Sequence, residues 1–415
     1  MNVSAPSQTV KSSNYSTRQA LIIYTIFQLA FSLLLWTPIF YEYQKISGLS
    51  DYEIFRIQSI YYVIFLLCEI PTGALADRLG YRLSLKLGAW VLLASNLLPI
   101  FWTSYAGFLT QFATLALARS LISGASSAWL YEFMKERGEP NAYKQLEGRT
   151  RAATLIGRVV GWAPMGMAMA WHPAIPYWAT AACSLMAIVY VYRLPPLALE
   201  KSEQSERGSM RTEALLNAIP KLVTQLRTQP YLLMVMVQGI SIFVLARIVM
   251  INLFQPILKS AGMSVASFGW LMAGMSLVEA LGSWHPAWIR RWVSDLTAVW
   301  MLTLLISLSL IPMAYGGVVG VVIGFSLFSL AFGFAFPIQK QLMNDTINNP
   351  KQRASLLSIE SLIDRAVCSI AVLPIGHMVA GQRMGELLLW AALGSMLVTT
   401  LVWGFARNMR HKTAN

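Results

Sequence analysis

The chain has 415 residues, of which 56% are hydrophobic and only 12% are charged. A soluble domain carries roughly a quarter charged residues, so this composition excludes an ordinary soluble protein and indicates one that crosses a membrane many times. The net charge of +13 does not indicate nucleic-acid binding, because most Lys and Arg residues fall in loops on one predicted side, which marks that side as cytoplasmic.

Apolar runs long enough to cross a membrane as helices follow one another along the chain. A span needs about 20 mostly apolar residues, which leaves room for about a dozen. The first six are expected near residues 20–43, 54–76, 83–102, 107–134, 152–171 and 175–192. The others are expected near residues 231–256, 266–289, 297–315, 318–343, 354–379 and 386–405. Pro38 should kink the first helix, because proline removes a backbone hydrogen bond.

One long polar stretch, residues 193–229, separates the two sets of spans. Within it, the amphipathic run at 214–226 is expected to lie on the membrane surface. We therefore expect a first helical bundle at 1–196, a cytoplasmic linker at 197–229 and a second bundle at 230–415. Both termini are expected to be cytoplasmic.

The most informative short segment is GALADRLGYR, residues 73–82, a charged turn between two apolar runs. Gly73 and Gly80 permit close approach and unusual backbone angles. Arg78 and Arg82 mark the cytoplasmic surface, and Asp77 follows the end of a helix. The order G-x-L-A-D-R-x-G-x-R resembles the loop between helices 2 and 3 of the major facilitator superfamily of transporters. We interpret these five residues as a conformational latch; an ordinary basic loop is the alternative.

That resemblance implies an all-α membrane protein with twelve transmembrane helices in two six-helix bundles. The bundles would be related by a pseudo-twofold axis, with the substrate site between them. A weak internal echo agrees with this: the triplet at 48–50, GLS, recurs as GMS at 262–264. The segments EIPTG at 69–73 and AWLYE at 128–132 look like those of bacterial drug and metabolite exporters. Export is therefore favoured over import.

Charged residues inside the spans cost about 3 kcal/mol each on insertion scales, so each needs a structural or functional reason. Glu360 and Asp364 are four residues apart, so they share one helix face, and two carboxylates that close resist ionising together, as a proton carrier requires. The alternative, of equal weight, is that Arg365 or an arginine of another helix permanently neutralises these two carboxylates. Glu279 is the second candidate for proton coupling. Arg119 imperfectly matches an exporter motif linked to proton transfer, which implies a coupling role.

The remaining candidates concern the substrate. Arg158 and Arg247 are near mid-span, where a guanidinium could grip a carboxylate or phosphate with two hydrogen bonds. Arg365 is grouped with them, and Trp36 and Trp129 could line a cavity. An anionic metabolite or siderophore would then be the substrate. Acids inside the membrane could instead neutralise every arginine.

Other chemistry has little support in the sequence. The three cysteines, at positions 68, 183 and 368, are scattered in apolar runs, which argues against a disulfide framework or a metal cluster. The sequence contains neither a G-x-x-x-x-G-K-[ST] phosphate loop nor an H-E-x-x-H motif, so direct use of ATP and one class of zinc protease are excluded. We expect no cofactor and no enzymatic activity.

The sequence is interpreted as a proton-coupled secondary transporter that exports a small organic molecule by alternating access. We expect it in the bacterial cytoplasmic (inner) membrane as a monomer, with substrate, proton and lipid bilayer as partners and no nucleic acid. Two alternatives remain open: a proton-symport importer of the same fold, and a non-transporting membrane sensor or scaffold.

Overall fold

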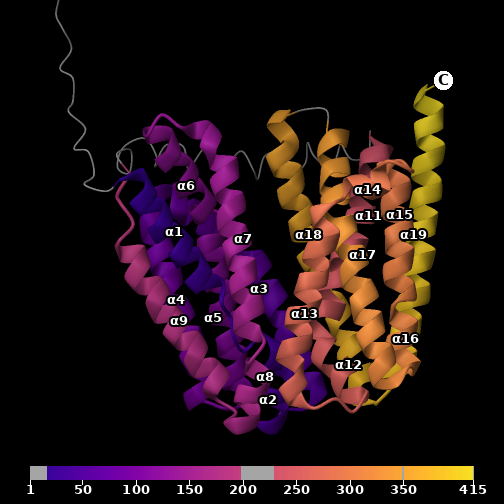
Figure 1. The fold of residues 1–415 in the computed structure, drawn as a ribbon, viewed down its shortest axis with the longest axis horizontal. Helices are drawn as coiled ribbons and strands as arrows, with labels where there is room; N and C mark the ends of the chain where they lie inside the picture. The colour runs from indigo at the N-terminus through magenta and orange to yellow at the C-terminus, as the bar shows by residue number, and fades with distance from the viewer. Residues whose placement is uncertain (1–15, 198–228, 348–349, 415) are drawn as a thin grey trace, which may run out of the picture.

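The computed structural model describes residues 16–197, 229–347 and 350–414. The predicted surface helix at 214–226 and most of the predicted linker lie outside these residues. Within them, the regular secondary structure is helical throughout. Two groups of helices stand side by side, one from each half of the chain (Figure 1).

The first group contains the first six spans, several of which are broken into two helices. Its helices are α1 (Thr17–Ser32), η1 (Thr37–Ile39), α2 (Phe40–Ile46), α3 (Asp51–Leu79), α4 (Tyr81–Phe101), α5 (Tyr105–Ser123), α6 (Ala125–Glu136), η2 (Pro140–Ala142), α7 (Tyr143–Trp162), α8 (Met165–Trp171) and α9 (Ile175–Tyr192).

The second group contains the remaining six spans. Its helices are α11 (Pro230–Arg247), the π-helical turn η3 (Ile248–Asn252), α12 (Phe254–Ser260), α13 (Val265–Trp284), α14 (Ala287–Arg290), α15 (Asp295–Leu308), α16 (Leu310–Tyr315), α17 (Gly317–Thr346), α18 (Pro350–Ala380) and α19 (Met384–Ala414). The chain is thus an all-helical membrane protein with twelve spans, counted over the described residues.

The breaks have local causes. The first span stops at Ser32 and resumes as a 3₁₀ turn that contains Pro38, so the predicted interruption is confirmed. The predicted continuous helix at 107–134 is wrong, because Gly124 separates α5 from α6. The fifth span begins at Tyr143, not near residue 152, and Pro164 separates α7 from α8. Proline cannot donate the helical hydrogen bond, and glycine weakens a helix interior.

Eight helical stretches of the described chain are long and apolar enough to cross a membrane, and α3 adds a ninth if its two parts, bent by 42°, count as one span. The other three spans are α5 with α6, α7 with α8, and α18. They carry Arg119, Arg158 and Glu360, respectively. Each of the spans with the weakest apolar signal therefore holds a charged candidate residue.

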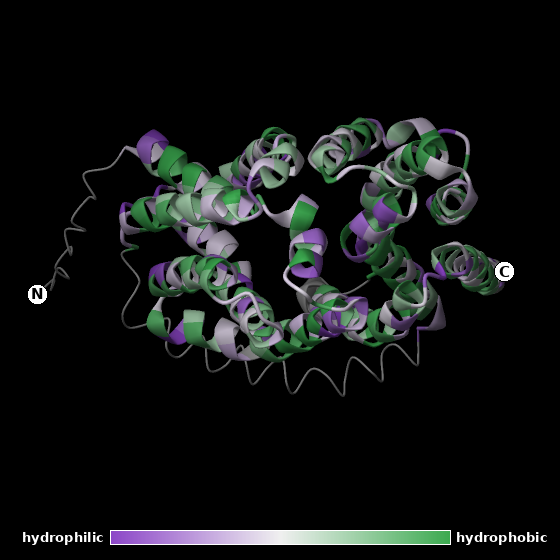
Figure 2. Cartoon of the chain, turned by 90° about the horizontal axis from the view of Figure 1, so that it is seen from below, coloured by the Kyte–Doolittle hydropathy of each residue, from purple (hydrophilic) through white to green (hydrophobic). Residues whose placement is uncertain are grey.

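The two groups touch along α3 with α18 and along α7 and α8 with α13. Glycine makes the second contact possible: a Cβ atom at Gly166 would collide with the carbonyl oxygen of Val265, and one at Gly269 with that of Trp162. Small residues let helix backbones approach in this way. Hydrophobic residues predominate on the helices, with hydrophilic turns between the two groups (Figure 2).

The groups meet at one end and diverge at the other (Figure 1). We call the end that holds α2 and α12 the closed end, and the end at which α1 begins and α19 ends the open end. At the closed end, Gln255 accepts hydrogen bonds from the backbone N–H groups of Tyr41 (3.0 Å) and Glu42 (3.2 Å). Lys259 also forms an ion pair with Glu42 at 2.5 Å. Polar contacts therefore seal this end between the bundles.

Candidate substrate and proton site

A pocket of about 310 Å³ lies in the second bundle, and the first bundle approaches it, because Arg151 of α7 lies over the ring of Phe336 in its lining. Its walls come from α11 with η3, α13, α17 and α18. Five ionisable side chains line it: Arg247, Glu279, Lys340, Glu360 and Asp364. The pocket therefore gathers the predicted carboxylates and one predicted arginine at a single place.

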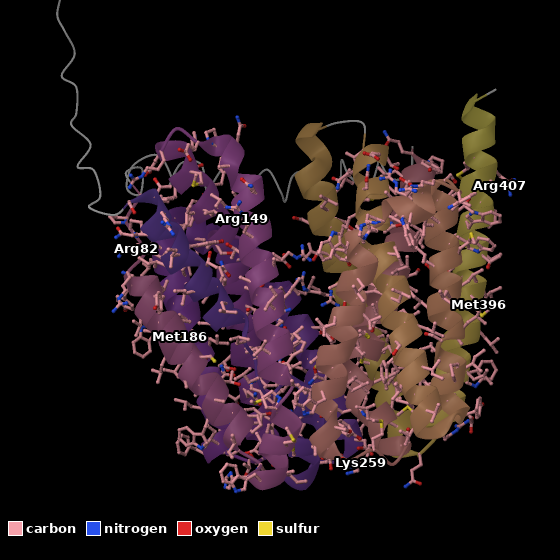
Figure 3. All side chains as sticks on the ribbon, in the orientation of Figure 1. Arg82, Arg149, Met186, Lys259, Met396 and Arg407 are labelled. Carbon is pink, nitrogen blue, oxygen red and sulfur yellow. The ribbon has the colours of Figure 1, made fainter. Side chains whose placement is uncertain are left out.

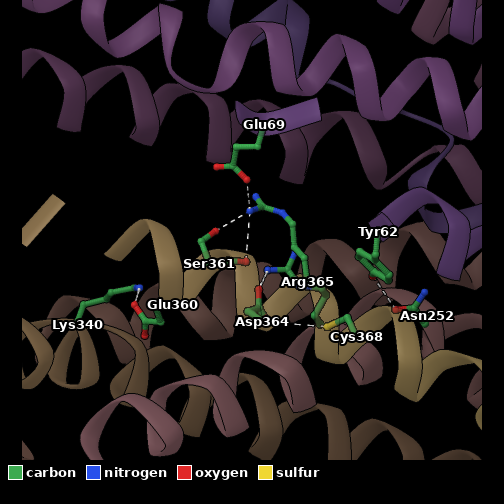
Figure 4. Close-up of polar contacts among 10 residues, drawn as sticks. Tyr62, Glu69, Asn252, Lys340, Glu360, Ser361, Asp364, Arg365 and Cys368 are labelled. Atoms are coloured by element: carbon green, nitrogen blue, oxygen red, sulfur yellow. Dashed lines mark hydrogen bonds and ion pairs between the residues drawn. The ribbon is translucent and has the colours of Figure 1, made fainter. Parts of the chain in front are cut away.

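Glu360 and Asp364 share one face of α18, as their spacing predicts, but each has its own cation. Lys340 donates to Glu360 at 2.9 Å, and Arg247 donates to Asp364 at 2.5 Å (Figure 4). The two residues are only 1% and 4% exposed. A buried carboxylate that is paired with a cation has its charge compensated locally. The geometry thus favours separate neutralisation over a shared proton, with Lys340 and not Arg365 as the partner of Glu360.

Arg365 turns away from the pocket, toward the first bundle. Its guanidinium donates to Glu69 of α3 at 2.8 Å and to the Ser361 hydroxyl at 2.6 Å (Figure 4). It also lies 4.0 Å from the ring centroid of Phe65. Arg365 is therefore part of the interface between the bundles and lies outside the pocket lining.

The first bundle contributes arginines that have no carboxylate at ion-pair distance among the described residues. Arg119 is exposed and makes one long hydrogen bond, 3.4 Å, to the Tyr61 hydroxyl. Arg158 lies 5.8 Å from the Trp162 ring, and its buried Nε has no hydrogen-bond partner in the described chain. Arg151 places its guanidinium 5.7 Å from the ring of Phe336, which lines the pocket from the second bundle.

Glu279 is the pocket carboxylate without an ion pair within the described residues. It is half-buried on α13. The cations that act on it, Arg151 and Arg158, come from α7 of the opposite bundle and act at longer range. Its cationic neighbours therefore come from the opposite bundle, unlike those of Glu360 and Asp364.

The two predicted tryptophans do not line the pocket. Trp36 is buried in the first bundle, where its Nε1 donates to Asn96 at 2.9 Å and its ring stacks on Tyr177. Trp129 is stacked between Tyr24 and Phe133 in the same bundle. Apolar helix cores also bury tryptophan, so position along a span alone could not separate packing from lining.

The predicted latch segment crosses from α3 to α4. Gly80 adopts φ +91°, a backbone conformation that other residues rarely adopt. This conformation explains why glycine occupies the position. Asp77 is 9% exposed, and Arg82 donates to the Tyr192 backbone oxygen at 2.9 Å within the same bundle. The latch function of Gly73, Asp77, Arg78, Gly80 and Arg82 stays a prediction.

Residue patterns alone missed two features of the site. Lys340 is not singled out by the sequence patterns, although it lies inside the predicted span at 318–343 and could have been grouped with the buried charges. Asn252, in the π-helical turn after Arg247, accepts a hydrogen bond from Tyr62 of the first bundle at 2.9 Å (Figure 4). π-Helical turns often mark functional sites, but sequence gives no direct signal for them. In the described part of the chain, no group of three or more His, Cys, Asp or Glu could hold a metal.

Comparisons with known proteins agree with this architecture. The family model described as Major Facilitator Superfamily matches residues 20–372. No curated protein sequence matches the chain. The crystal structure of the nucleoside transporter NupG is 14% identical, with TM-score 0.73, and the match covers 93% of this chain and 98% of that one.

Two other solved structures are similarly close. The crystal structure of peptide transporter POT in complex with sulfate is 13% identical, with TM-score 0.73 and 94% of each chain covered. That of a D-xylose-proton symporter is 15% identical, with TM-score 0.69, and the match covers 94% of this chain and 98% of that chain. At these identities the likeness shows a shared fold.

Proposed function

The chain belongs to the major facilitator superfamily, and on that basis we propose that it is a proton-coupled secondary transporter that exports a small organic anion. The observation that carries this proposal is the pocket of the second bundle, which is lined by five ionisable side chains, and Arg151 and Arg158 of the first bundle act on one of them, Glu279. Inside a membrane such groups are expensive, and they mark substrate and proton pathways. We propose no enzymatic role.

We propose that the protein works as a monomer in a bacterial cytoplasmic membrane, with bundles at 1–196 and 230–415 joined by a linker at 197–229. Arg82, Arg149 and Arg407 lie toward the open end (Figure 3). Excess positive charge marks the cytoplasmic side, which supports a cytoplasmic open end and cytoplasmic termini. The structure would then correspond to the inward-open state of an alternating-access cycle.

Three carboxylates are proposed to serve proton coupling, and Glu279 has the strongest case. Glu360 and Asp364 already form ion pairs with Lys340 and Arg247 of their own bundle. Glu279 depends on longer-range cations of the other bundle, so its protonation can change when the bundles move apart. Arg119 is proposed to assist from the first bundle, where it lies within electrostatic range of Arg158.

The proposal can be tested in inverted membrane vesicles that contain the full-length protein. Vesicles with an acidic interior are offered labelled organic anions, and accumulation is measured with and without an uncoupler. Export coupled to proton antiport predicts uncoupler-sensitive accumulation in inverted vesicles. Accumulation only in right-side-out vesicles would instead indicate a proton-symport importer. If neutralising Glu279, Glu360 and Asp364 one at a time leaves every flux unchanged, a sensor or scaffold is the better description.

A further inference from the structure

One wall of the pocket is aromatic. Phe243 of α11 and Phe332 of α17 both contact Phe336, with ring centroids 5.5 Å and 5.9 Å apart. All three rings line the pocket, together with the apolar side chains of Met250 and Ile251. A continuous surface of this kind binds a flat, apolar body, because aromatic rings pair in offset or edge-to-face arrangements.

The cations of the second bundle are already occupied. Arg247 is bonded to Asp364, and Lys340 is bonded to Glu360. An added anion would have to compete with these buried carboxylates, and breaking a buried ion pair is costly. The interface cation Arg365 is likewise held by an acid of the first bundle. A substrate anion therefore finds little free positive charge on this side.

The first bundle offers the free positive charge. Arg119 and Arg158 have no ion pair with a described residue and lie within electrostatic range of each other. The buried Nε of Arg158 is a donor without an acceptor in the described chain. A buried donor without a partner loses its hydration at a cost that an anionic ligand would recover. Glu279, which lines the pocket, is the carboxylate that acts on Arg158 at longer range.

We infer, on the basis of the transport function proposed above, that the substrate is a small aromatic carboxylate. Its carboxylate lies between Arg119 and Arg158 of the first bundle, and its ring lies against Phe243, Phe332 and Phe336 of the second. The ligand therefore bridges the two bundles through different chemistry on each side. This arrangement narrows the substrate class: an aromatic wall of this kind suits an anion with a ring better than a polycarboxylate without one. The pocket volume of about 310 Å³ is at the small end for ligand sites.

Three probes with one aromatic body and different head groups test the inference. These are 3-phenylpropionate, neutral 3-phenylpropionamide and cationic 3-phenylpropylamine, with propionate as the fourth compound that lacks the ring. Binding to the purified full-length protein is measured by titration calorimetry. 3-Phenylpropionate should bind at least tenfold more tightly than 3-phenylpropionamide, 3-phenylpropylamine and propionate. Equal or tighter binding of the amide or amine would overturn the anionic head group, and equal binding of propionate would overturn the aromatic wall.

Variants then locate the two halves of the ligand. Arg158→Ala should weaken 3-phenylpropionate binding at least tenfold, and Phe336→Ala should weaken it while leaving propionate unaffected. Arg193→Ala is the matched control, because Arg193 also lies beside an aromatic ring, 5.5 Å from that of Tyr190, but stands at the end of α9 and is not among the cations that act on Glu279. Unchanged binding in Arg158→Ala would contradict the inference. Should that variant fail to fold, the four-compound series on the unmodified protein still decides the question.

The binding assay requires no ion gradient, so it separates this inference from the proposed function. Tight and selective binding of 3-phenylpropionate without any flux would support the site and refute proton-coupled export. Proton-coupled flux of other compounds, with no binding of 3-phenylpropionate, would support the function and refute the substrate class.

Discussion

Arg365 of α18 donates a hydrogen bond to Glu69 of α3, at 2.8 Å, across the interface between the two helix bundles. The preceding residue, Asp364, is bonded instead to Arg247 of its own bundle. Adjacent residues of one helix thus connect the pocket to the interface (Figure 4). A displacement of α18 would disturb both ion pairs, which gives the pocket a direct physical link to the arrangement of the bundles.

The first prediction concerns this interface pair. Glu69→Gln leaves the partly buried guanidinium of Arg365 with a neutral partner, so the free energy of unfolding should fall by about 1–3 kcal/mol. The exchange of charges in Glu69→Arg with Arg365→Glu should recover part of that loss. Thermal unfolding of the purified variants measures both effects. No recovery in the exchanged variant would mean that the ion pair itself adds little.

The closed end supplies the second prediction. Gln255 joins α12 to the backbone of α2, so Gln255→Leu removes hydrogen bonds between the bundles and should favour opening at this end. Cysteines are placed at Ile46, which is 54% exposed at the closed end, and at Ser260 of α12, and each carries one spin label. The distance distribution between the labels should broaden toward longer values.

The control for that measurement is Gln44→Leu. Gln44, of α2, is a buried amide like Gln255, but its side chain has no hydrogen-bond partner in the described chain. The two variants therefore remove the same chemical group with and without an inter-bundle contact. An identical response of both would refute a sealing role for Gln255.

The third prediction addresses the latch segment. Asp77→Asn should reduce transport at least about tenfold while leaving expression intact, since loss of a charge removes a charged hydrogen bond worth that much. Gly80→Ala should lower stability as well, because φ +91° is strained for a residue with a Cβ atom. Flux in vesicles and quantitative immunoblotting separate the two effects. Normal turnover in Asp77→Asn would refute the latch.

The fourth prediction concerns the ion-paired carboxylates. Glu360→Gln combined with Asp364→Asn should abolish accumulation driven by a pH gradient, yet leave exchange of substrate across the membrane. Since each substitution also leaves Lys340 or Arg247 without its partner, the melting temperature should fall too. Counterflow and gradient-driven uptake are compared in the same proteoliposomes. Continued accumulation against a gradient would place the coupling elsewhere.

Sequence patterns predicted much of this fold because length and hydropathy directly encode membrane spans. The last helix of the first bundle begins and ends at the predicted residues 175 and 192. The breaks at Gly124 and Pro164 were harder to predict, because an apolar run does not reveal where one helix ends and the next begins. The start of α7 at Tyr143 was missed since its first turns are polar.

The site was only partly predictable for a different reason. The spacing of Glu360 and Asp364 correctly placed them on one face, but their partners, Lys340 and Arg247, come from helices α17 and α11. Which helix faces which is a tertiary property that spacing within one span does not contain. The same limit explains why Trp36 was expected at a cavity and lies inside a bundle.

The most direct test of proton-coupled transport compares the unmodified protein with Glu279→Gln in proteoliposomes that contain a trapped pH-sensitive dye. Addition of a transported anion should cause an immediate proton flux in the unmodified protein. Glu279→Gln should still exchange labelled substrate but should move no protons with it, because its side chain cannot ionise. Equal proton flux per substrate in both proteins, or none in either, would contradict the account.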